Sequence, residues 1–176
     1  LSRQEVACHE LEAAIRHLFL SEELVTAHLL TWAALDVISD VGKARGSVTL
    51  RGRMVEKMPV EMQNAWRKAE RDHYNFMKHA DRDPDRKIRL IPDMTLFAIY
   101  VACRDYLSVF NGKTAIMAIY TGWYVSQNPE MGVSFDAEFR TTLPETFGST
   151  PNEAWAEVKI MLEVAVNDPE FATRRD

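Results

Sequence analysis

Cysteine is scarce in this sequence. Only Cys8 and Cys103 occur among 176 residues, which excludes a disulfide-rich scaffold and leaves a single disulfide as the one open pairing. Both cysteines lie in apolar helical patterns, VACHEL and YVACRDYL, where a thiol packs as a small hydrophobic group. We therefore expect a reducing, cytoplasmic setting.

Long hydrophobic runs are also missing. No apolar stretch reaches the length of about 18 residues that a membrane-spanning helix needs. The first twenty residues, LSRQEVACHELEAAIRHLFL, carry charge throughout, so we expect neither a signal peptide nor a membrane partner. The sequence has no internal repeat and no glycine-rich phosphate loop, and no useful length of it alternates as a β-strand does.

Helical periodicity is what the sequence does contain. It predicts an all-α fold, a bundle of five to seven helices in one domain that spans residues 1–176. Between the helices we expect a loop at 42–57, a second loop at 82–92 and a weaker segment at 129–149. The expected helices cover residues 3–20, 22–41, 59–80, 94–110, 114–127 and 151–166.

Capping signals mark several helix ends. Thr150, Pro151 and Glu153 predict a capping box with proline in the first turn of the last helix. We expect Gly42 to end the second helix and Asp93 to cap the helix after Pro92.

Charge is unevenly distributed. The net charge of −5 argues against a general nucleic-acid coat. Residues 67–89 nevertheless hold eight Lys or Arg against five Asp or Glu, whereas residues 130–170 hold two basic residues against nine acidic ones. A locally basic segment on an acidic protein indicates a confined anion site, self-complementary docking, or a solvated charged helix end.

The helix expected at 59–80 has two distinct stripes. Its polar stripe lies more than about 100° from the centre of the apolar seam, so it faces either solvent, a cleft or a subunit interface. The apolar seam comprises Met62, Trp66, Ala69, His73, Phe76 and Ala80, and the polar stripe comprises Lys68, Asp72, Asn75 and His79.

The end of this helix, Asn75-Phe76-Met77-Lys78-His79, resembles the core of the HEPN motif, in which Arg and a polar residue precede His by a fixed spacing. It also resembles uncharacterised bacterial helical proteins that carry an NF-x-KHAD segment. HEPN domains are all-α, commonly dimeric, and many are metal-independent RNases whose Arg and His residues meet at the dimer interface. Tyr74 occupies the Arg position here, so Arg71 or Arg82 would have to replace it.

The resemblance implies a division of roles for RNA cleavage. A histidine can take or give the proton of the 2′-hydroxyl, which assigns general acid–base chemistry to His79. Asn75 would position the phosphate or orient that histidine. Lys78, Arg71 and Arg82 are the candidate charge stabilisers.

Two residues would support this site indirectly, through other residues of the site. Asp81 would hold the arginines in place; otherwise its charge, like that of Asp83, would repel an anion. His28 lies in the most apolar helix, where it is either a buried, hydrogen-bonded core histidine or a partner of the site near His79.

Metal and cysteine chemistry have weaker signals. Glu70 and His73 have the Glu-x-x-His spacing of a di-iron ligand pair, but the ferritin-like pattern needs two such pairs and two further glutamates. We therefore expect no metal and no cofactor. The aromatic residues of helices 94–110 and 114–127 indicate core packing first; Trp123 and Tyr124 would otherwise wall a pocket for a flat ligand or form a dimer interface.

These observations leave two functions open. The first is a non-catalytic interaction or regulatory module that forms a homodimer. The alternative is a metal-independent RNase, or an RNA-binding protein, that acts through Asn75 and His79 at a dimer cleft.

Overall fold

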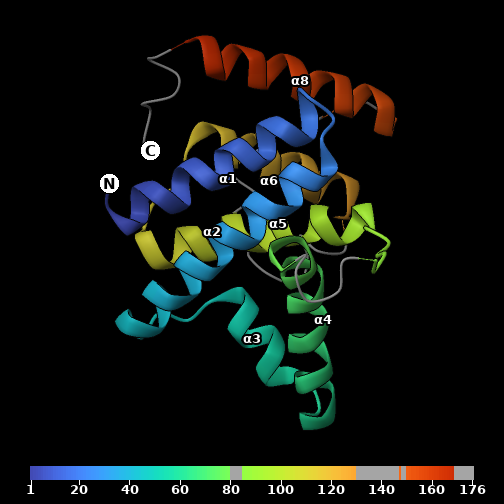
Figure 1. Cartoon of the computed structure of the whole chain (residues 1–176). Helices are drawn as coiled ribbons and strands as arrows, with labels where there is room; N and C mark the ends of the chain where they lie inside the picture. The colour runs from blue at the N-terminus through green and yellow to red at the C-terminus, as the bar shows by residue number, and fades with distance from the viewer. Residues whose placement is uncertain (80–84, 130–146, 148–149, 169–176) are drawn as a thin grey trace.

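Helices account for the regular structure that the computed structural model gives to residues 1–79, 85–129, 147 and 150–168, so the all-α prediction is confirmed for these ranges. Figure 1 shows their arrangement. In chain order the helices are α1 (Arg3–Phe19), α2 (Leu24–Arg45), α3 (Leu50–Lys57), α4 (Val60–Lys78), α5 (Pro92–Phe110), α6 (Ala115–Gln127) and α8 (Pro151–Asn167).

The core lies among α1, α2, α5 and α6, and α8 packs on α6 and α1 along one side of the bundle (Figure 1). Phe19 of α1 links the two parts, because its ring stacks on Trp155 of α8 at a centroid distance of 4.1 Å and meets Trp123 of α6 edge-on at 5.0 Å. Tyr100 and Tyr120 are fully buried. The predicted core role of the aromatic residues in α5 and α6 is therefore confirmed.

Helix α2 is the central helix of the bundle. It is long and apolar enough to cross a membrane by length and composition, a test that the core helix of a soluble protein also passes. Within this structure it packs on α1 and α5 and buries residues such as Trp32, Leu35 and Ile38.

The predicted loop at 42–57 is wrong. Helix α2 continues to Arg45 and ends at Gly46, which adopts the left-handed conformation at φ 65°; residues 50–57 then form α3. Gly42 does not end α2, because it is a buried contact point: a Cβ there would lie 3.1 Å from Cγ2 of Val109 on α5. Its missing side chain permits close helix packing and does not serve a turn.

The helix ends confirm one predicted cap and correct another. The Thr150–Glu153 capping box is present, with the Glu153 amide donating to Thr150 Oγ1 at 3.3 Å and the Thr150 amide donating to Glu153 Oε2 at 3.0 Å. Asp93 is not a cap. Helix α5 begins two residues earlier than predicted, at Pro92, whose fixed φ suits the first helical position, and Asp93 lies in the first turn.

Asp105 of α5 fixes the start of α3. Its carboxylate accepts hydrogen bonds from the backbone amides of Leu50 at 2.5 Å and Arg51 at 3.4 Å, while Thr49 Oγ1 accepts from the Gly52 amide at 3.0 Å. These contacts satisfy amides that a helix N-terminus otherwise leaves unpaired. A helix of eight residues is too short to be stable without such support.

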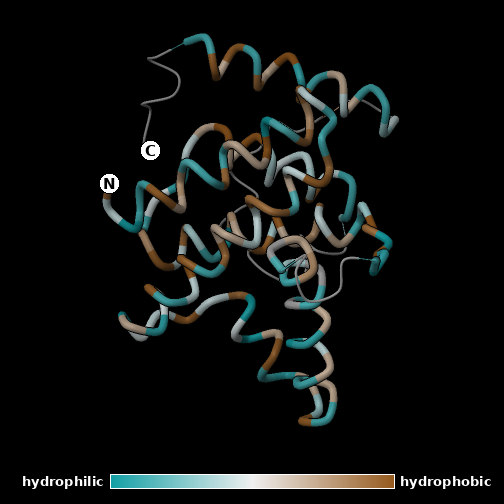
Figure 2. Tube along the Cα trace, viewed as in Figure 1, coloured by the Kyte–Doolittle hydropathy of each residue, from teal (hydrophilic) through white to brown (hydrophobic). Residues whose placement is uncertain are grey.

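Helices α3 and α4 together form an arm, residues 50–78, that projects from the bundle (Figure 1). Figure 2 shows hydrophobic colour near its far tip, where Val60 is 70% exposed and Met62 is 56% exposed. Among the described helices, α4 packs on α2 over a short length only. The arm is therefore held by few contacts.

Asp105 should make stability depend on pH. Burial raises its pKa from 3.8 to about 6, although the amides of Leu50 and Arg51 act in the opposite direction. The folded state then binds the proton more tightly than the unfolded chain. Protonated Asp105 therefore stabilises the folded state by up to about 3 kcal/mol below about pH 4. This contribution to the free energy of unfolding is lost as the pH rises to about 6.

Denaturant unfolding of the wild type and Asp105→Asn across this range checks the prediction. We expect the wild type to lose stability relative to the variant as the pH rises from about 4 to about 6. A relative gain over the same range would show that the helix N-terminus holds the pKa of Asp105 below 3.8.

Candidate functional site

The stretch that resembles the HEPN motif lies at the end of α4. Asn75 is exposed in the last turn, and His79 is half-buried and follows the helix as its C-cap residue. The His79 backbone amide donates to the Asn75 carbonyl at 2.9 Å. The structure therefore places these two residues one helical turn apart.

Four other predicted site residues cannot be placed in the same way. Arg82 and Asp81 lie outside the described residues. The side chains of Arg71 and Lys78 also lie outside the described part of the structure, although both residues belong to α4.

His28 lies in the core, where α2 packs on α5. It is 1% exposed, and its Nδ1 is 2.9 Å from the Thr95 hydroxyl. Its ring also meets Trp32 edge-on at a centroid distance of 5.9 Å. These contacts hold His28 inside the bundle.

One basic residue near the predicted site was not expected from the sequence. Arg86 pairs with Asp72 of the polar stripe, Nη2 to Oδ2, at 3.0 Å, and its guanidinium lies 5.9 Å from the centre of the Phe76 ring. Both partners of this ion pair are substantially exposed, so it contributes little to stability. It does place a cation beside the polar stripe.

The predicted apolar seam of α4 is wrong at two positions. Met62 is 56% exposed and Ala69 is also exposed, whereas Glu70 is only 6% exposed. Tyr74, one turn after Glu70, is half-buried and packs against the hydrophobic core. The buried face of α4 is thus rotated toward Glu70, because the carboxylate of Glu70 pairs with a charged side chain of α3.

That partner is Arg51 of α3. The guanidinium binds the Glu70 carboxylate through two contacts, Nε to Oε1 at 3.2 Å and Nη2 to Oε2 at 2.9 Å. The side chains are 22% and 8% exposed, respectively. A two-contact arginine–carboxylate pair in this setting fixes geometry as well as charge, so it ties α3 to α4.

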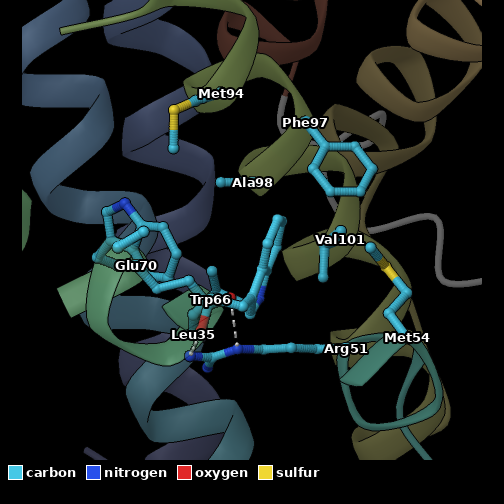
Figure 3. Close-up of a pocket in the computed structure, with 11 residues that line it drawn as sticks. Leu35, Arg51, Met54, Trp66, Glu70, Met94, Phe97, Ala98 and Val101 are labelled. Atoms are coloured by element: carbon cyan, nitrogen blue, oxygen red, sulfur yellow. Dashed lines mark hydrogen bonds and ion pairs between the residues drawn. The ribbon is translucent and has the colours of Figure 1, made fainter. Parts of the chain in front are cut away.

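The same ion pair forms one wall of a cavity of about 180 Å³. Figure 3 shows Arg51 reaching across to Glu70, with Met94, Ala98 and Val101 of α5 on other sides. The cavity lies where α2, α3, α4 and α5 meet. Its lining comprises Trp32, Leu35, Arg51, Met54, Trp66, Ala69, Glu70, Met94, Phe97, Ala98 and Val101.

Two of the residues that line the cavity are tryptophans. The indole Nε1 atoms of Trp32 and Trp66 are buried and have no hydrogen-bond partner among the described residues. Trp32 is 7% exposed as a whole, and the Arg51 guanidinium lies 5.6 Å from its ring centre.

The described residues can also be searched for metal ligands and reactive thiols. Among the residues that the structure describes, no three His, Cys, Asp or Glu side chains gather as a metal site would require. Cys8 and Cys103 are not joined by a disulfide. Burial raises the pKa of the Cys103 thiol far above its ordinary value, and a neutral buried thiol is a poor nucleophile.

The sequence analysis missed this cavity. Glu70 was considered only as half of a Glu-x-x-His pair, and Arg51 only as part of an expected loop. A signal did exist, since Glu70 sits one turn from both Trp66 and Tyr74 on a single helical face. Its partner could not be identified, because Arg51 belongs to a different helix.

We predict that Glu70→Gln destabilises the protein by about 2–4 kcal/mol, because it leaves the Arg51 guanidinium without its carboxylate in a mostly buried position. Chemical denaturation checks this. Glu61→Gln, an exposed change in the first turn of the same helix, should stay within about 0.5 kcal/mol of the wild type. Equal effects of the two substitutions would contradict a structural role for the pair.

Comparison of the chain with protein-family models, with curated proteins and with solved structures finds no match. The resemblance of residues 75–79 to the HEPN motif therefore stays a prediction, and function has to be argued from the geometry of the side chains.

Proposed function

We propose that the protein is a non-catalytic regulatory module that takes up a small apolar ligand between its arm and its bundle. One observation carries this proposal: the cavity wall is shared. Arg51, Met54, Trp66, Ala69 and Glu70 come from the α3–α4 arm, and the remaining lining residues come from α2 and α5.

Because the arm and the bundle each supply part of the cavity wall, ligand binding in the cavity depends on the position of the arm. The Arg51–Glu70 pair lies within the arm, and apart from the contacts of Asp105 with α3, few interactions hold the arm to the bundle. A ligand in the cavity would contact α4 on one side and the bundle on the other. It would therefore stabilise the docked arm over any arrangement in which α4 moves away.

The size of the cavity suits a single ring. Its volume is about 180 Å³, and an engineered apolar cavity of about 150 Å³ in another protein binds benzene. The aromatic rings of Trp32, Trp66 and Phe97 and the thioethers of Met54 and Met94 line it. Aromatic and apolar side chains with a few polar groups are the usual lining of a small-molecule site.

Ethylbenzene, a neutral single-ring compound, tests this proposal. We expect it to raise the melting temperature, since a ligand at about 100 times its Kd stabilises the native state by about 2.7 kcal/mol. Hydrogen exchange should slow in α4 and stay unchanged in α8, which lies on the other side of the bundle (Figure 1).

A filled cavity should abolish the response. Ala98→Leu places a larger side chain in the cavity from a position that is 6% exposed, so the variant should fold and no longer respond to ethylbenzene. The matched control Ala65→Leu changes an exposed residue of α4 and should respond as the wild type does. Absence of any wild-type response, or an equal response of all three proteins, would refute the proposed binding function.

A second candidate function rests on the polar stripe. We propose as the alternative that Asn75 and His79 form a metal-independent RNA-cleaving or RNA-binding site between two copies of the chain in the cytoplasm. The exposure of Asn75, the position of His79 at the helix end and the nearby Arg86 support it. The homodimer is part of this alternative, because the HEPN-like cleft needs two protomers.

For this alternative, His79→Ala should lower the rate of RNA cleavage by about 10²–10⁴-fold, the usual cost of losing a general acid or base. Its stability should change by no more than about 0.5 kcal/mol if the side chain has no packing role. Cleavage of a labelled RNA at low salt and light scattering check the two parts. A monomeric wild type that neither binds nor cuts RNA would end this alternative.

A further inference from the structure

We infer that a second copy of the chain docks antiparallel along the exposed side of α4, so that two arms form a symmetric pair. Helix α4 belongs to the arm that projects from the bundle (Figure 1). The docking surface, which we call the open seam, comprises Met62, Ala65 and Ala69, with Glu61 and Lys68 along one edge. The inference does not rest on the proposed ligand.

The apolar residues of the open seam are spaced as those of a coiled coil are. Met62 is 56% exposed, and Ala65 and Ala69 are exposed as well, although Ala69 also lines the cavity. They occur at i, i+3 and i+7, so they lie on one side of the helix. A second helix that covers this side would bury apolar side chains that the described part of the chain leaves exposed, which favours association.

Arg86 limits the length of the open seam. Asp72 and Phe76 continue the same spacing toward the end of α4, but Arg86 pairs with the first and lies over the ring of the second. The seam therefore ends at Ala69 and spans about 10 Å, two turns of helix. An interface of this size is small, so we expect a weak and reversible contact.

The charges at the edge of the seam are self-complementary. Glu61 and Lys68 are exposed and lie seven residues apart on one edge of the helix. In a twofold pair, residue i of one copy meets residue j of the other, and j meets i. With Ala65 at the axis of an antiparallel pair, each Glu61 meets Lys68 of the other copy, and each Met62 lies near the small Ala69. A parallel pair would bring like charges together, which is unfavourable.

The same charges favour a second copy over other partners. The open seam carries one acidic and one basic residue, so it offers no net charge to a nucleic acid or an anionic membrane. The interface also differs from a HEPN-like cleft. In this register the two His79 residues lie at opposite ends of the pair, on the order of 40 Å apart along the helices.

Charge substitutions test the register. Glu61→Lys and Lys68→Glu each turn two attractions into two repulsions, so each should weaken self-association about tenfold. The double variant exchanges the charges and should regain the wild-type dissociation constant to within about threefold. An equimolar mixture of the two single variants should form mixed dimers more tightly than either variant pairs with itself, because lysines of one chain then face glutamates of the other.

Analytical ultracentrifugation from micromolar to millimolar concentration measures these dissociation constants. Low salt is required, because the exposed charge pairs are screened at high salt. The wild-type dissociation constant should therefore rise as salt is added.

The apolar part of the seam needs a separate variant. Met62→Gln removes an apolar side chain from each half of the pair and should weaken self-association about tenfold. The matched control is Val164→Gln on α8, where the valine is 51% exposed and lies outside the seam; it should associate as the wild type does. All of the changed residues are exposed, and circular dichroism checks that each variant keeps its helix content.

The outcomes separate this inference from the proposed functions. A wild type that stays monomeric at millimolar concentration would overturn it, as would a dimer that the charge exchange fails to restore or that Met62→Gln leaves intact. Equal weakening by Val164→Gln would place the contact on α8 and overturn it as well. A dimer with the expected pattern supports the inference whether or not ethylbenzene binds or RNA is cut.

Discussion

The ion pair between Arg51 and Glu70 is the interaction on which the arrangement of the arm depends. It joins α3 to α4 through two contacts in a mostly buried setting, so that the face of α4 that carries Glu70 is buried and Met62 is exposed. Without this ion pair, the face of α4 that carries Trp66 would not be held toward α5. The same charged pair forms part of the cavity wall.

A second polar contact holds the backbone of Arg51 in position. Asp105 of α5 accepts hydrogen bonds from the amides of Leu50 and Arg51, so the residue that binds Glu70 is itself held at the start of a short helix. A chain of contacts thus runs from α5 through α3 to α4. A change in either carboxylate should alter the cavity wall, because both bind residues in the first turn of α3.

Local signals were sufficient for much of the fold. The capping box at Thr150 and Glu153 and the burial of Tyr100 and Tyr120 followed from spacing and composition. Gly42 was wrongly predicted to end α2 for a physical reason: glycine is common at helix ends, but it also occurs where a neighbouring side chain packs closely on the helix backbone, as Val109 packs on α2. Only knowledge of the neighbouring helix separates these two roles.

The sequence by itself determined an all-α chain with an aromatic core, because apolar periodicity and caps are local properties. The tertiary structure decided which face of α4 is buried, since that depends on Arg51, which the sequence places in an expected loop 19 residues before Glu70. It also decided that Trp32, Trp66 and Phe97 share one cavity. Pairings between helices depend on packing in three dimensions, and no pattern within a single helix encodes the partner.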